Sequence, residues 1–264
     1  MLKKYMKHEI KTQGKMMAII YSVLAMTTML TLVLFWLQKF SQHPFFEGIY
    51  YIVCGIYGIS VIVSAVVSFI YLCYHFYHTM YSQQGYLTHT LPLKTTDILH
   101  VKILVSCGFL FLTVVFCVLS FAALGALNEG LSAGELVNVV MQVLSEAGEE
   151  LGVSSAAAML LILLIVIAGC TSSLLMFFAG SSVGQLFPHS KGVWGIAAGI
   201  GIYYISEVIS AGIAVAVFCL AYINMPEKMK FAWFAAGMII MLLFWTVVYY
   251  IVCRKILLKH LNLE

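Results

Sequence analysis

Apolar side chains along this chain form six long runs that are separated by short polar segments. The runs cover residues 16–37, 48–74, 103–127, 153–180, 192–222 and 231–253. A helix needs roughly 20 residues to cross about 30 Å of hydrocarbon, and every run reaches that length. Together the runs contain one formal charge, Glu207. A membrane β-barrel would instead show segments of about ten residues in which apolar and polar positions alternate. The pattern therefore predicts an all-α membrane protein with six transmembrane helices.

The composition supports this assignment. Of the 264 residues, 62% are hydrophobic and 9% are charged, whereas soluble domains carry about 25% charged residues. So few charged side chains cannot cover the surface of a soluble globule of this size. The sequence therefore excludes an ordinary soluble protein, and lipid is the expected solvent for the transmembrane domain over residues 16–253.

The basic residues predict the orientation of the bundle, because loops rich in Lys and Arg stay in the cytoplasm. With a cytoplasmic N-terminus, eleven of the 14 Lys and Arg residues lie on the inner side, and Lys39, Lys228 and Lys230 lie on the outer side. We expect a multi-pass plasma-membrane protein with both termini in the cytoplasm, including a basic tail over residues 254–264. The basic side is expected to face anionic lipid, and no nucleic-acid partner is expected.

The segment before the first run, residues 1–15, has the pattern of an amphipathic helix. Apolar and basic positions recur at helical spacing on two faces: Leu2, Tyr5, Met6 and Ile10 on one, and Lys3, Lys7 and Lys11 on the other. Such a helix lies in the inner membrane interface with its lysines on lipid phosphates. A frayed basic tail is the alternative.

The longest outer connection, between the third and fourth runs, also predicts a helix. Ser132 and Glu135 have the spacing of a capping box, and apolar residues recur near a period of 3.6 up to Leu151. We expect an outer amphipathic helix over residues 132–151 that rests on the membrane or on the bundle. A gate for exported substrate is the functional alternative, and packing alone also explains the pattern.

Two inner connections display apolar residues. The first covers residues 75–102; Gly85 permits the chain to reverse, and Tyr86, Leu87, Leu91 and Leu93 follow around Pro92. The second covers residues 181–191 and contains Leu186 and Phe187. Exposed apolar surface of this kind marks a site for a partner. The equally weighted alternative is that both loops are turns folded against their own bundle.

Three short motifs resemble the permease subunits of type-2 ABC exporters, in particular the compact six-span bacterial kind that works with a separate ATPase. They are Gly85-Tyr86-Leu87-Thr88-x-Thr90-Leu91-Pro92-Leu93 with Lys102 after it, Gly184-Gln185-Leu186-Phe187 with Lys191, and the tail Leu261-Asn262-Leu263-Glu264. The resemblance implies that residues 85–93 form a coupling helix that docks into the ATPase, and that residues 2–15 form the interfacial connecting helix. Six spans with short loops enclose little space, so we expect the substrate route to form with a partner, either a second permease copy or a related permease.

The chain lacks chemistry of its own for using ATP. A phosphate-binding P-loop needs Gly-x-x-x-x-Gly-Lys-Ser/Thr, but Gly14-Lys15 has Glu9 in place of the first Gly and Met16 after it. The sequence contains neither His-Glu-x-x-His nor Gly-x-Ser-x-Gly. We therefore expect a non-enzymatic subunit without a cofactor or metal, with ATP and Mg²⁺ bound by the partner ATPase.

Polar residues inside the predicted spans are candidates for a substrate route. Glu207 lies roughly 22 Å along the fifth span from its inner edge, with Tyr203 on the same face. It either contacts substrate or becomes hydrated where the span breaks near Ser206. The second span carries a polar stripe, which favours helix packing over a substrate cavity: Tyr57, Ser60, Ser64, Ser68 and Tyr71. Gly195-x-x-x-Gly199 in the fifth span predicts a close helix contact.

These observations favour an ATP-driven exporter that moves amphipathic or antimicrobial peptides out of the cell. Lipids or hydrophobic drugs are the alternative cargo. A secondary transporter or a membrane enzyme without an ATPase partner is the alternative of another class. The single charge away from the centre of a span and the lack of a catalytic motif make both less favoured.

Overall fold

Proline positions explain why the apolar runs become long unbroken helices. Pro44 is the first residue of the second helix, where its missing N–H is not needed, and Pro92 and Pro226 lie between helices. The computed structural model describes residues 1–259 except 42, 43, 91, 129, 131, 188, 189 and 225. These described residues form eight helices: α1 (Leu2–Ser41), α2 (Pro44–Met80), α3 (Gln83–His89), α4 (Thr95–Asn128), α5 (Ala133–Leu151), α6 (Ser155–Gly184), α7 (Lys191–Asn224) and α8 (Glu227–Lys259). Six of them are long and apolar enough to span a membrane.

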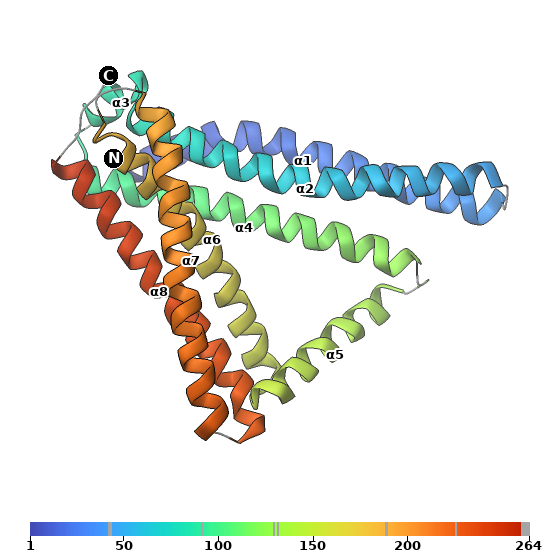
Figure 1. Ribbon diagram of the computed structural model, residues 1–264. Helices are drawn as coiled ribbons and strands as arrows, with labels where there is room; N and C mark the ends of the chain where they lie inside the picture. The colour runs from blue at the N-terminus through green and yellow to red at the C-terminus, as the bar shows by residue number, and fades with distance from the viewer. Residues whose placement is uncertain are drawn as a thin grey trace.

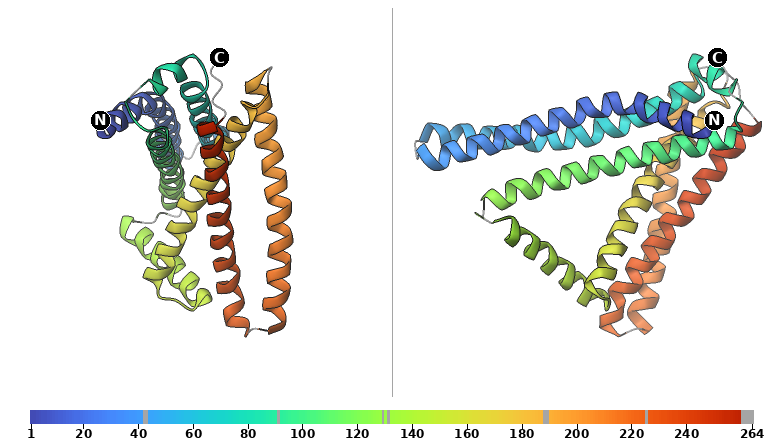
Figure 2. Two further views of the ribbon diagram at one scale, coloured as in Figure 1. Left: turned by 90° about the vertical axis from the view of Figure 1, so that its left-hand side faces the viewer. Right: turned by 180° about the vertical axis from the view of Figure 1, so that it is seen from behind.

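The long helices form two bundles that meet at one end and separate toward the other (Figure 1). The N-terminal bundle contains α1, α2 and α4, and the C-terminal bundle contains α6, α7 and α8. The start of α1, the short helix α3 and the end of α8 gather where the bundles meet, which we call the convergent end. Helix α5 joins the ends of α4 and α6 that lie far from the convergent end. The view from behind shows the same two diverging bundles (Figure 2).

The hydrophobic core lies at the convergent end. Phe76 of α2 stacks on Phe178 of α6 with ring centroids 3.8 Å apart, and Met17, Leu72 and Leu174 are buried beside them. Just after α2, the Tyr81 hydroxyl lies 2.6 Å from Ser182 Oγ of α6. A smaller buried cluster, Leu24, Tyr57, Val61 and Leu124, holds the N-terminal bundle together farther out. The two bundles are therefore joined mainly at one end.

Helices α6 and α7 contact each other through backbone atoms at glycine positions. A Cβ added at Gly180 would lie 2.5 Å from the Gly199 Cα, and one added at Gly184 would meet the backbone of Gly195. Contacts this close exclude any side chain. The close contact predicted for Gly195 and Gly199 is confirmed, and its other half is a second pair of glycines at the same spacing.

Helix α5 has the predicted ends. The Glu135 N–H donates to Ser132 Oγ, and the Ser132 N–H donates to Glu135 Oε2 over 2.6 Å. Gly152 closes the helix with φ +66°, a conformation that favours glycine. The apolar side chains of Val137, Val140 and Met141 are exposed. The helix is confirmed, whereas its resting place on a membrane stays a prediction.

Several expected boundaries shift because hydropathy marks where lipid begins and not where a helix ends. Residues 2–15 are helical but continue without a break into the first span, so the structure has one helix, α1, over both. The first inner connection shortens from 75–102 to 81–94, and the second shortens from 181–191 to 185–190. Most of the expected tail belongs to α8, and the tail motif over 261–264 lies outside the described residues.

Candidate functional site

Helix α3 presents two apolar side chains outward at the convergent end. Tyr86 is 66% exposed and Leu87 is 68% exposed. Gly85 is buried within the helix, so the chain reversal expected at Gly85 is wrong; the chain turns at Tyr81 and Ser82 instead. Pro92 is exposed, Leu93 packs against the core, and Leu91 lies outside the described residues.

One side-chain hydrogen bond fixes α3 to the bundle, and a backbone bond closes its C-terminal end. Thr88 Oγ1 donates to the Thr79 carbonyl of α2 over 2.9 Å. The Thr90 N–H, at the C-terminal end of the short helix, donates to the Tyr86 carbonyl over 3.1 Å. Seven helical residues are too few to be stable alone, so these contacts and the packing of Leu93 hold the exposed face in place.

A buried ion-pair cluster lies directly behind α3. Glu9 Oε1 of α1 lies 2.8 Å from His75 Nε2 of α2 and 3.0 Å from Lys102 Nζ of α4. Glu9 is 4% exposed and Lys102 is 1% exposed. Gln13 Nε2 also donates to Glu9, and Ser106 Oγ donates to Gln13 Oε1 over 3.4 Å. A buried charge needs such partners, because an unpaired one is strongly unfavourable.

The cluster links α3 to the three helices of the N-terminal bundle. Lys102 Nζ donates to Thr79 Oγ1 over 2.6 Å, and the carbonyl of the same threonine accepts from Thr88. Contacts therefore run from Thr88 through Thr79 and Lys102 to Glu9. A cavity of about 590 Å³ adjoins this path; residues of α1, α2, α3 and α4 and of the segment before α4 line it, among them Tyr5, Gln84 and Leu87.

This cluster is not apparent from the sequence, in which Glu9 belongs to the expected interfacial helix and Lys102 follows the first apolar motif. One local signal existed: Glu9 and Gln13 precede Met17 at steps of four, so they extend the buried face of α1 toward its N-terminus. The partners themselves come from helices far along the chain.

The connection between α6 and α7 is also partly exposed. Leu186 is exposed, whereas Phe187 stacks on Trp194 of α7 with ring centroids 4.5 Å apart. Of the two residues expected to form a second apolar contact, one is free to meet a partner and one packs on its own bundle.

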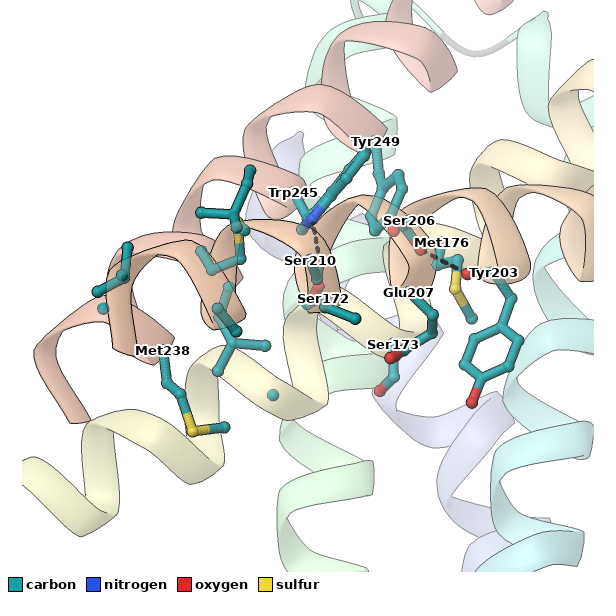
Figure 3. Close-up of a pocket in the computed structure, with 18 of the residues that line it drawn as sticks. Ser172, Ser173, Met176, Tyr203, Ser206, Glu207, Ser210, Met238, Trp245 and Tyr249 are labelled. Carbon is teal, nitrogen blue, oxygen red and sulfur yellow. Dashed lines mark hydrogen bonds between the residues drawn. The ribbon is translucent and has the colours of Figure 1, made fainter. Parts of the chain in front are cut away.

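A second cavity, of about 430 Å³, lies between α6, α7 and α8. Its polar lining includes Tyr203, Ser206 and Glu207 of α7 and Ser173 of α6 (Figure 3). Trp245 Nε1 of α8 donates to Ser210 Oγ over 2.8 Å across the cavity. Helix α7 continues through Ser206 and Glu207, so the expected alternative of a break there is wrong.

The polar stripe of the second span lies inside the N-terminal bundle. Tyr57 donates to Ser120 Oγ over 2.8 Å, and Ser60 Oγ lies 3.0 Å from Thr27 Oγ1. Ser64 donates to the Val61 carbonyl, and Ser68 is fully buried. None of these four lines either cavity. Their contacts with neighbouring helices agree with the packing interpretation.

Two histidines near the convergent end form hydrogen bonds with side chains of other helices. His75 bonds Glu9, and His100 Nε2 lies 2.7 Å from the Tyr250 hydroxyl. In the part of the chain that the structure describes, three or more His, Cys, Asp or Glu side chains do not gather around a point that could hold a metal ion.

Comparisons with models of protein families, with curated proteins and with solved structures find no match for this chain. What the protein does must therefore be argued from its own geometry.

Proposed function

We propose that the chain is the membrane-spanning subunit of an ATP-driven exporter and that a separate cytoplasmic ABC ATPase docks on α3. The observation that carries the proposal is the exposed pair Tyr86 and Leu87 on a short helix that a hydrogen bond from Thr88 to α2 fixes to the bundle. An apolar helix face at a protein surface suits a groove in a partner. The exposed Leu186 provides a second contact.

The distribution of Lys and Arg supports placing the convergent end, and α3 with it, in the cytoplasm. Basic residues near both chain ends, among them Lys3, Lys4, Arg254 and Lys255, belong to helix segments that lie at the convergent end. A concentration of Lys and Arg favours the cytoplasmic side of a membrane. In our proposal the convergent end, both termini and α3 therefore face the cytoplasm, and α5 lies outside.

The contacts behind α3 suit a coupling role. The partner binds ATP and Mg²⁺ and pushes on α3 as it closes. The push passes through Thr88 and Thr79 to Lys102 and Glu9, which belong to different helices of one bundle. Because the two bundles meet mainly at the convergent end, a tilt there changes their separation at the far end. A second copy of the chain, or a related permease, completes the route.

The cargo that fits best is an amphipathic peptide, including antimicrobial peptides, with lipids and hydrophobic drugs as alternatives. The cavity between α6, α7 and α8 supports this class, because apolar walls surround a few hydroxyls and one carboxylate. A secondary transporter is less favoured, since its ion sites use broken helices and α7 is continuous through Glu207.

The proposal requires a separate ABC ATPase, which we expect to be encoded in a neighbouring reading frame, and co-purification with that ATPase tests the docking. Leu87→Asp places a charge on the exposed face of α3 and should abolish co-purification. The matched control is Leu258→Asp, which changes an exposed leucine at the convergent end of α8. The control should bind the ATPase as the unaltered chain does. Retained binding in Leu87→Asp, with both variants folded, overturns the proposal.

A further inference from the structure

Glu207 is the one formal charge among the described residues that line the cavity between α6, α7 and α8. The other polar groups of the lining are hydroxyls of Ser and Tyr and the indole N–H of Trp245. The lining includes no Lys or Arg in the part of the chain described. The cavity therefore carries a net negative charge when the carboxyl is ionised.

The hydroxyls around Glu207 are already used in other bonds. Ser206 donates to the Tyr203 carbonyl, Ser173 donates to the Cys170 carbonyl, and Ser210 accepts from Trp245. No hydrogen bond or ion pair joins the Glu207 carboxylate to another described residue. An unpaired carboxylate within a membrane span is costly and marks a functional site.

The cavity is polar at one end and apolar at the other. Figure 3 shows Glu207, Ser173 and Tyr203 toward one end and Met238 toward the other. Phe234, Ala214 and Val217 also belong to the apolar end. The polar end is nearer the convergent end, and Val217 follows Glu207 by ten residues of helix, or roughly 15 Å. This length and a volume of about 430 Å³ suit a chain-like organic ligand.

Aromatic rings flank the polar end. Trp245 and Tyr249 of α8 stack on each other with ring centroids 5.6 Å apart, and both line the cavity. Aromatic faces attract cations through their negative π surfaces. Glu207 itself is exposed, and the same cavity lining contains this carboxylate and the stacked aromatic rings. Together these groups favour a positively charged head group over a neutral or anionic one.

We propose that this cavity binds an amphipathic cation, with its ammonium group against the Glu207 carboxylate and its apolar chain along Met238 and Phe234. The inference deepens the proposed function, on which it rests for treating the occupant as cargo. Binding itself needs neither the ATPase nor ATP.

The test uses the fluorescence of Trp245 in the full chain, reconstituted in phosphatidylcholine nanodiscs. Replacing the other three tryptophans by Phe (Trp36→Phe, Trp194→Phe and Trp233→Phe) leaves Trp245 as the only reporter. The probe is dodecyl-(3-bromopropyl)-dimethylammonium, whose bromine lies three carbons from the ammonium nitrogen and so quenches indole fluorescence at the polar end; its neutral counterpart is dodecyl 3-bromopropyl ether. We expect saturable quenching by the ammonium probe and only weak, unsaturable quenching by the ether.

Glu207→Gln should raise the half-saturating concentration of the ammonium probe by about tenfold, because a charge-assisted contact is lost. The control Glu47→Gln, which removes a carboxylate at the start of α2, should bind like the parent. Equal quenching by the two probes, or unchanged binding in Glu207→Gln, overturns the proposal. Equal quenching decides the matter even where Glu207→Gln does not fold, because that comparison uses the unaltered cavity.

This test and the docking test fail separately. Leu87→Asp should leave quenching unchanged, since α3 is not part of this cavity. Glu207→Gln should leave co-purification with the ATPase unchanged.

Discussion

The two bundles of this protein are held together by different means. Helices of the N-terminal bundle are joined by polar side chains: Glu9 with Lys102 and His75, and Tyr57 with Ser120. Helices α6 and α7 of the C-terminal bundle meet through glycine backbone at Gly180 and Gly199. The two bundles also differ in how a carboxylate is placed. Glu9, near the convergent end of the first bundle, is buried and contacts Lys102 and His75, whereas Glu207, along a span of the second, has no ion-pair partner among the described residues and lines a cavity.

In our proposals this difference separates a charge that holds the fold together from a charge that binds a ligand. A paired, buried charge such as Glu9 fixes the positions of three helices at one point. The C-terminal bundle is tightly packed near the convergent end, at Gly184 and Gly195, and becomes open farther along the same helices, where Gly169 and Val217 line the cavity. In our proposals the N-terminal bundle is thus suited to transmit force, and the C-terminal bundle is suited to hold a ligand.

The largest expected effect is the loss of the Glu9 pair. Lys102→Met leaves the carboxylate buried without its strongest partner and should lower the free energy of unfolding by about 3–5 kcal/mol. The measurement is thermal or denaturant unfolding in detergent micelles. The control is Lys94→Met, which changes an exposed lysine just before α4. It should have little effect.

The double variant Glu9→Gln, Lys102→Met sharpens this prediction. It removes both charges and should recover most of the lost stability, because a neutral pair has no uncompensated charge. If Lys102→Met is as stable as Lys94→Met, the cluster does not hold the N-terminal bundle together.

The glycine contact is expected to have the next largest effect. Gly180→Ala forces α6 away from α7 and should destabilise the protein by about 1–3 kcal/mol. The matched control is Gly212→Ala on α7, where an added Cβ meets no described atom within 4 Å. That change should be neutral or stabilising by up to about 1 kcal/mol, because alanine favours the helix. Equal melting temperatures for the two variants would contradict the close contact.

The sequence predicts those parts of the fold that depend on neighbouring residues. Hydropathy is a property of a run, so the six spans follow from it, and the capping box of α5 needs only Ser132 and Glu135. The contact between Glu9 and Lys102 joins residues 93 apart, and nothing in either local pattern names the other. Gly85 shows a related limit, because glycine permits a turn without requiring one.

The candidate sites were predictable to different extents. Glu207 was found because a lone charge in an apolar run is conspicuous, but the cavity around it depends on α6 and α8. The apolar residues Tyr86 and Leu87 could be recognised in the local sequence. The hydrogen bond from Thr88 to the Thr79 carbonyl, which fixes α3 to α2, could not. For the polar stripe of α2, the choice between a cavity and packing depended on which helices face it.

The polar stripe itself allows a smaller and more local test. Tyr57→Phe removes the bond to Ser120 and should cost about 1 kcal/mol. Ser68→Ala removes a fully buried hydroxyl that has no hydrogen-bond partner among the described residues, and it should leave stability unchanged or raise it. Unfolding of both variants in the same micelles compares them directly. A loss in Ser68→Ala equal to that in Tyr57→Phe would show that the stripe has another role.

The smallest expected effect concerns α5, which joins the two bundles. The backbone N–H of Ser132 and then its hydroxyl bond the Glu135 carboxylate, and they lower the pKa of this group below its ordinary value of 4.5. A carboxyl with a lowered pKa contributes stability above its unfolded pKa and loses it as the pH falls through the folded pKa. The N-terminal turn of α5 should therefore fray only below pH 4.5. Carboxyl chemical shifts of Glu135 measure the titration, and Ser132→Ala should move its midpoint upward. An unchanged midpoint would mean that the capping box does not hold this end of α5, and the link between the bundles would then depend on the contacts of α5 with α4, α6 and α8.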